Sequence, residues 1–158
     1  MTPSRFVAVT ALLLVAVCSW STAATAQTTS TGPRTILVVI SSANQREPLT
    51  LAQVRRIFLK EVTVWSNGWP ITVFERSTDH PIRAIFSSAV IGRTPAQLSE
   101  YWLGLALTRG LDPPKVCRTS TLLRQYLERV KGGIGYVYED ELESGMTIVT
   151  RVVPKSDR

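Results

Sequence analysis

The chain has 158 residues, a formal net charge of +6, 1 histidine and 2 cysteines. This length fits a single domain. The basic residues fall singly or in pairs along the whole chain, without the concentrated basic face of a nucleic-acid-binding protein. The composition therefore argues against a nucleic acid partner and predicts a solvated surface that attracts anions.

Residues 1–26 have the three parts of a secretory signal peptide. A positive charge at Arg5 precedes the apolar run FVAVTALLLVAV, and small residues at Ala24 and Ala26 offer a cleavage site after Ala26. The sequence predicts export, with a retained N-terminal anchor as the alternative, followed by a flexible leader over residues 27–34. Cleavage removes Arg5 and leaves 17 basic against 12 acidic residues, a net charge of +5.

Cys18 directly follows the apolar run and is a candidate for lipid attachment. A lipoprotein signal needs a small residue before the cysteine, and Val17 stands there instead. Cleavage after Ala26 is therefore favoured over a lipid anchor. The exported chain then keeps one cysteine, Cys117, so it forms no internal disulfide and depends on its hydrophobic core.

Strand and helix patterns alternate after the leader. Residues 35–41 (TILVVIS) form a β-branched run typical of a buried strand. Residues 50–60 predict an amphipathic helix, which Thr50 and Gln53 begin with a capping box. The alternating residues 71–75 predict a second strand.

Two further helices follow a polar turn. Residues 81–92 predict a short helix ended by Gly92, and residues 94–110 predict a longer one. Thr94 and Gln97 form a capping box for the longer helix, which Gly110 ends. Its apolar stripe, interpreted as core, consists of Leu98, Tyr101, Trp102 and Leu105.

The C-terminal part completes the pattern. Two prolines make residues 111–118 extended. An amphipathic helix over 119–133 and two strands follow, at 134–138 and 146–153. The alternation predicts one α/β domain over residues 35–153, with a mixed sheet covered by helices, and a tail at 154–158.

The residue inventory gives no support for metal binding or catalysis. His80 and Cys117 are the imidazole and thiol left after cleavage, and their spacing matches no metal site. No acid, base and nucleophile set can be assembled. The glycine-rich KGGIGYV runs from helix into strand, the reverse of a phosphate-binding loop. The sequence predicts a non-enzyme without cofactor, metal or catalytic residues.

The turn ERSTDHPI has the order that an anion site requires. A strand ends at Glu75, a turn carries Arg76, Ser77, Thr78 and His80, and a helix begins near Pro81. The free N–H groups at the helix start, together with the Arg76 guanidinium and the hydroxyls, favour an anion.

A simpler interpretation of the same turn is a helix cap. Ser77, Thr78 or Asp79 would cap the helix, and Arg76 would pair with Glu75 or Asp79. Both interpretations remain open at this level.

The motifs together resemble the phosphate-type periplasmic substrate-binding proteins of ABC importers. The similarity covers nearly all of residues 35–153. It rests on PLTLAQVRRIFLKEVTVW, on ITVFER with a phenylalanine ten residues after Arg76, on LSEYW, on the proline pair and on GGIGYV. The resemblance implies a single periplasmic-binding-protein-like lobe, because members of the family are about twice as long and have two lobes that close on the anion.

The anion motif departs from the family pattern, which is Arg, any residue, Asp, any residue, Ser-Gly-Thr. Arg76 matches, but Thr78 stands at the aspartate position. His80, Pro81 and Ile82 replace Ser-Gly-Thr. Lys60 also replaces a glycine at the corner after the first helix.

The resemblance implies a periplasmic, non-catalytic phosphate-binding-like protein of an ABC transporter, with weak or altered recognition of inorganic oxyanions at Arg76, Ser77, Thr78 and His80. A protonated His80 would assist, since a nearby anion raises its pKa. The alternative is an envelope interaction module that kept the fold and lost the ligand. The implied partners are an inorganic anion, an ABC permease or an envelope protein, and a second copy of the chain.

Overall fold

The computed structural model describes residues 34–44 and 48–155. The predicted signal peptide, the lipidation candidate Cys18, the leader before Arg34 and the last three residues of the tail lie outside the described residues. In chain order the elements are β1 (Ile36–Ser41), α1 (Leu51–Phe58), β2 (Thr72–Arg76), α2 (Pro81–Phe86), the π-helix η1 (Ser87–Ile91), α3 (Pro95–Arg109), β3 (Lys115–Cys117), α4 (Ser120–Arg129), β4 (Gly133–Tyr138), the 3-10 helix η2 (Glu139–Glu141) and β5 (Met146–Val152).

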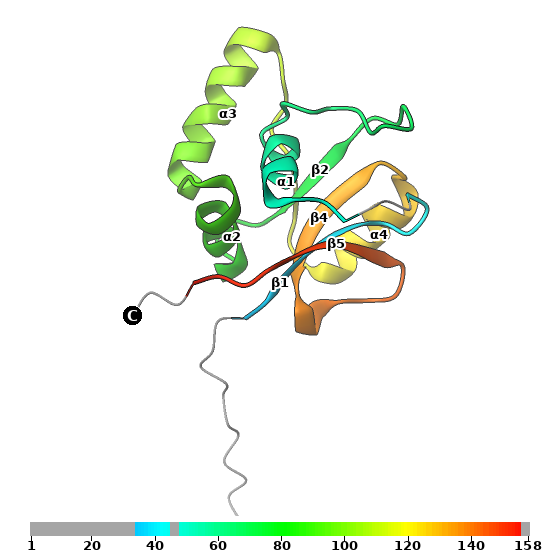
Figure 1. The fold of residues 1–158 in the computed structure, drawn as a ribbon. Helices are drawn as coiled ribbons and strands as arrows, with labels where there is room; N and C mark the ends of the chain where they lie inside the picture. Colours follow the sequence, from blue (N-terminus) through cyan, green and yellow to red (C-terminus); the bar gives the residue numbers. More distant parts are fainter. Residues whose placement is uncertain (1–33, 45–47, 156–158) are drawn as a thin grey trace, which may run out of the picture. The chain divides into compact units, whose positions relative to one another are not determined.

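The strands form one five-stranded sheet in the order β3-β2-β4-β1-β5 (Figure 1). Strand β2 runs parallel to β3 and β4, whereas β1 is antiparallel to β4 and β5. The mixed α/β sheet predicted from the sequence is therefore confirmed. The extended proline segment contributes β3, a short strand at the edge of the sheet.

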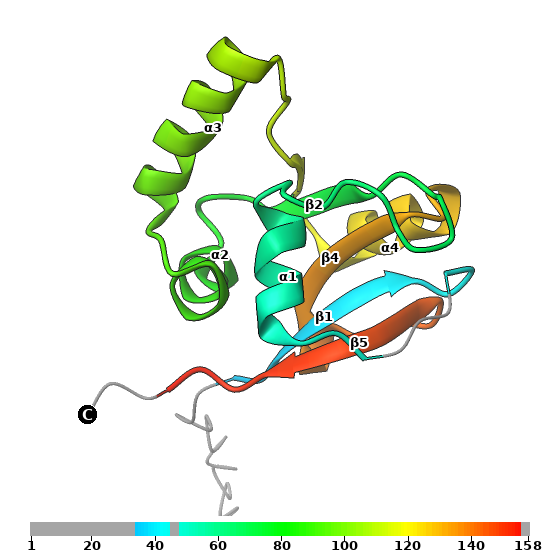
Figure 2. The same ribbon diagram turned by 45° about the horizontal axis from the view of Figure 1, so that its top comes forward.

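Strand β1 shows why its sequence is apolar throughout. All six of its residues are buried. Ile36, Val38 and Ile40 join the core formed with α1, α2, η1 and α3, while Leu37 and Val39 join a second core under α4. Figure 2 shows the strands between α1 and α4. A strand covered on both faces loses the alternation of a half-exposed strand.

Local signals fixed the ends of the helices. Both predicted capping boxes form, Thr50 with Gln53 and Thr94 with Gln97. The helix predicted at 81–92 ends at Gly92, but it changes from α2 into the π-helix η1 at Ser87. No described helix has the length and apolarity needed to cross a membrane.

The glycine-rich stretch after α4 lets two parts of the chain approach closely. A Cβ on Gly132 would lie 2.0 Å from the carbonyl oxygen of Pro70. The Gly132 carbonyl accepts hydrogen bonds from the Thr72 N–H (3.1 Å) and from Trp65 Nε1 (3.0 Å). These contacts show that Gly132 permits close packing just before β4, whereas the C-cap of α4 is Val130 and not a glycine.

Two positions depart from what the sequence indicated. Lys60 adopts φ 55°, in the left-handed region that favours glycine, at the corner where the family pattern has one. Arg83, grouped in the sequence with the dispersed surface charges, is 5% exposed and forms an ion pair with the buried Glu75. That interpretation of Arg83 was wrong, because α2 packs this side chain against the sheet.

Candidate oxyanion site at the end of the parallel strands

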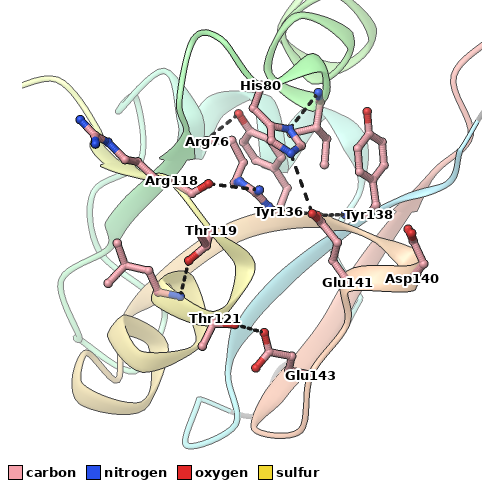
Figure 3. A network of polar contacts seen from close by, with 12 residues as sticks. Arg76, His80, Arg118, Thr119, Thr121, Tyr136, Tyr138, Asp140, Glu141 and Glu143 are labelled. Atoms are coloured by element: carbon pink, nitrogen blue, oxygen red, sulfur yellow. Dashed lines mark hydrogen bonds and ion pairs between the residues drawn. The ribbon is translucent and has the colours of Figure 1, made fainter.

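The strands β2, β3 and β4 run parallel, so their carboxyl ends lie at the same end of the sheet. Strand β2 ends at Arg76, which pairs in register with Cys117 at the end of β3. Strand β4 lies on the other side of β2 and ends at Tyr138. Ligands of α/β proteins bind outside the carboxyl ends of parallel strands. The predicted turn therefore meets the segments that follow β3 and β4 (Figure 3).

Arg76 ends its strand as predicted, but its partner is an acid that the sequence did not suggest. The side chain is only 3% exposed, and Nη1 lies 3.0 Å from Oε2 of Glu141. Nη2 donates to the Arg118 carbonyl oxygen at 3.4 Å, and the Arg76 N–H donates to the Tyr136 hydroxyl at 3.3 Å. The expected pairing of Arg76 with Glu75 or Asp79 is wrong. Glu75 forms its ion pair with Arg83, and Arg76 forms its own with Glu141.

Glu141 brings its carboxylate between three groups of the site. It belongs to η2, the single turn after β4. Its Oε2 also accepts the Tyr138 N–H at 3.1 Å, and its Oε1 lies 3.9 Å from Nε2 of His80. Figure 3 shows it directed toward Arg76 and His80. The Glu141 carboxylate thus accepts a hydrogen bond from the Arg76 guanidinium, the group that would otherwise donate to a bound oxyanion.

His80 caps α2, a role assigned from the sequence to Ser77, Thr78 or Asp79. Its Nδ1 accepts the Ile82 N–H at 3.4 Å, so the neutral ring carries its proton on Nε2. Burial, and then the charge of Arg76, lower the pKa of His80 below its ordinary value of 6.5, although Glu141 opposes this. Without a bound anion, the lowered pKa favours the neutral ring at pH 7. The raised pKa expected beside a bound anion stays a prediction.

Ser77, Asp79 and His80 of the turn border an open polar depression. Its lining consists of Ser77, Asp79, His80, Pro81 and Arg118. A hydrogen bond from Ser77 is the main cause that lowers the pKa of Asp79. Thr78 is exposed and does not line the depression. The structure thus places Ser77 and His80 together and adds Arg118.

Glu141 and Arg118 are the site residues that sequence reasoning missed. Arg118 directly follows β3, and Glu141 closes the acidic run at 139–141 after β4. The sequence did contain a signal for both residues. Each is a charged residue that follows a predicted extended segment, and parallel strands place the residues after their carboxyl ends close together. The strand order needed to use that signal is not local information.

Acidification is expected to destabilise the protein through His80. The pKa of His80 is lowered in the folded state, so the unfolded chain takes up this proton at a higher pH. The contribution of neutral His80 to stability is complete above about pH 6.5 and is lost as the pH falls through the lower folded pKa. Denaturant unfolding at pH 7.5 and 5 should show a larger loss for the wild type than for His80→Asn, which retains a capping side chain. Equal losses in the two proteins would contradict this.

Solved structures provide the comparison for this fold and site. No family model and no curated protein matches the chain. An ABC-type phosphate transport receptor from Vibrio cholerae matches with a TM-score of 0.58 at 15% identity, over 75% of this chain and 47% of that chain. PstS from Borrelia burgdorferi matches with a TM-score of 0.56 at 13% identity, over 76% of this chain and 49% of that one. The chain has the fold of one periplasmic-binding-protein-like lobe.

The lobe predicted from the sequence resemblance is thereby confirmed as a fold. It spans about half the length of the receptors it matches. A shared fold does not carry a shared ligand, which depends on the residues of the site. In the described part of the lobe, no group of three His, Cys, Asp or Glu residues is placed to hold a metal ion.

Proposed function

We propose that the protein is an exported, periplasmic, non-catalytic member of the phosphate-type substrate-binding group, with weak recognition of inorganic oxyanions. The proposed anion-binding residues are Arg76, Ser77, Thr78 and His80. The fold supports this proposal, because the matched solved structures include a phosphate transport receptor. The location supports it as well, because the turn lies where β2 and β3 end.

The single observation that supports weak binding is the Arg76–Glu141 ion pair. A bidentate guanidinium is the strongest oxyanion donor that the turn offers. Here it is 3% exposed and 3.0 Å from a carboxylate. The lowered pKa of His80 favours its neutral form at pH 7, so the ring adds little positive charge. An oxyanion must therefore compete with Glu141, which favours low affinity.

Thermal unfolding with and without anions tests this function. At 10 mM phosphate or sulfate, a dissociation constant near 1 mM would stabilise the folded state by about 1.4 kcal/mol. We expect the melting temperature to rise by the amount that corresponds to this stabilisation. The reference is the same protein in sodium chloride of equal ionic strength. Submicromolar affinity would contradict weak recognition, and the absence of any shift would contradict oxyanion binding.

The same ion pair also favours the second candidate, an interaction module of the cell envelope that lost its ligand. A site that supplies its own carboxylate needs no solution anion for Arg76. Two leucines on α3 would be available to contact a protein partner, because Leu103 is 62% exposed and Leu107 is 79% exposed. Under this reading an ABC permease, another envelope protein or a second copy would be the partner. Melting temperatures that do not respond to any oxyanion would favour it.

A further inference from the structure

We propose that Glu141 is an internal carboxylate ligand that masks Arg76 from oxyanions in solution and sets the low affinity of the site. This inference rests on the proposed function and names the residue that regulates it. Removing the Glu141 charge should convert a weak site into a stronger one.

The acidic run after β4 shows that Glu141 is directed specifically at the site. Asp140 pairs with Arg34 at 2.5 Å, and Glu139 pairs with Arg151. Both of these pairs are exposed, with side-chain exposures of 48–68%. Glu141 alone among the three acids contacts the buried Arg76. Figure 3 shows the contact between Glu141 and His80 and draws none from Asp140 to His80 or Arg76.

The guanidinium keeps capacity for another acceptor. Its Nη1 bonds Glu141 at 3.0 Å, and its Nη2 bonds a carbonyl at a long 3.4 Å. Arg76 Nε is buried and has no hydrogen-bond partner among the described residues. A tetrahedral oxyanion offers several acceptor oxygens to the same fork, whereas Glu141 satisfies it only in part.

Glu141 can leave without disrupting the core. The turn η2 that carries it has no buried residue, and the Glu141 side chain is 23% exposed. Arg76, in contrast, is held by a strand in the middle of the chain's sheet, between β3 and β4. The movable partner of the pair is therefore the carboxylate. A change of the partly exposed Glu141 side chain would free Arg76 while the strand that carries Arg76 stays in place.

The competition is strong because the carboxylate is attached to the same chain. A tethered group acts at an effective concentration of millimolar or more, even when the tether is flexible. A charge-assisted hydrogen bond of this kind lowers the affinity of an external competitor by about tenfold to hundredfold. Glu141→Gln keeps the shape and an oxygen that accepts the Tyr138 N–H, but it removes the charge.

Glu143 provides a matched control two residues away. It also pairs with an arginine, since its Oε2 lies 2.9 Å from Nε of Arg124. Its Oε1 accepts the Thr121 hydroxyl at 2.9 Å. Figure 3 shows this contact apart from Arg76. Glu143→Gln removes the same charge from the same segment without touching the proposed site.

The experiment is calorimetric titration of the wild type, Glu141→Gln and Glu143→Gln with inorganic phosphate and with sulfate. We expect Glu141→Gln to bind about tenfold to hundredfold more tightly than the wild type, and Glu143→Gln to bind as the wild type does. Thermal unfolding adds a second readout. Without anion, Glu141→Gln should melt below the wild type because Arg76 is left unpaired, and phosphate should restore it.

A double variant keeps the test valid if the single variant folds poorly. Arg76→Gln with Glu141→Gln removes both charges, so it should recover stability without anion and respond to none. Wild-type binding that Glu141→Gln leaves unchanged would overturn the masking role alone. Absence of binding in both proteins would overturn the masking role and the proposed function together.

Discussion

Replacing Arg83 by methionine is expected to lower the free energy of unfolding by about 3–5 kcal/mol. The change leaves Glu75, which is 4% exposed, as a buried carboxylate without its ion-pair partner. Denaturant unfolding at pH 7 measures the loss. Arg129→Met, at the exposed end of α4, should change stability by only about 0.5 kcal/mol.

A double variant separates the missing partner from lost packing. Burial raises the pKa of the Glu75 carboxyl more than Arg83 lowers it, so desolvation outweighs the attraction. Glu75→Leu with Arg83→Met removes both charges and should recover most of the lost stability. If the double variant is as unstable as Arg83→Met, the arginine acts through packing and not through the ion pair.

Replacing Trp102 by alanine is expected to cost about 3–5 kcal/mol. Trp102 is 5% exposed, and together with Leu98 it forms the buried part of α3. Its ring contacts Tyr101 edge-on, with ring centroids 5.0 Å apart. Removing the Trp102 ring leaves a cavity, and Leu98 is then the one buried residue of this 15-residue helix.

Trp102→Phe is the matched control for this prediction. Trp102 Nε1 is buried without a hydrogen-bond partner among the described residues. Phenylalanine keeps most of the apolar contact and removes that donor, so it should cost far less than alanine. An alanine variant that loses less than about 1 kcal/mol would show that the buried face of α3 contributes little to stability.

Most of the helices and strands lie where local signals in the sequence predicted them. Caps such as Thr50 with Gln53 depend on residues three positions apart, and they form as expected. Gly92 and Gly110 end their helices in the left-handed conformation that glycine adopts without strain. The buried run of β1 also followed from residue type alone. These signals depend only on residues close together in the chain, so they can be recognised without knowledge of the fold.

Which charged groups form pairs could not be predicted from local sequence, because the pairs depend on how the chain folds. Glu141 lies 65 residues from Arg76 in the chain, and the two come together because β4 pairs with β2. Arg83 resembles a surface arginine in sequence, and its burial depends on how α2 packs on the sheet. The charge state of His80 likewise follows from burial and from Arg76. Pairing of distant strands and desolvation are properties of the assembled fold, and no short stretch of sequence encodes them.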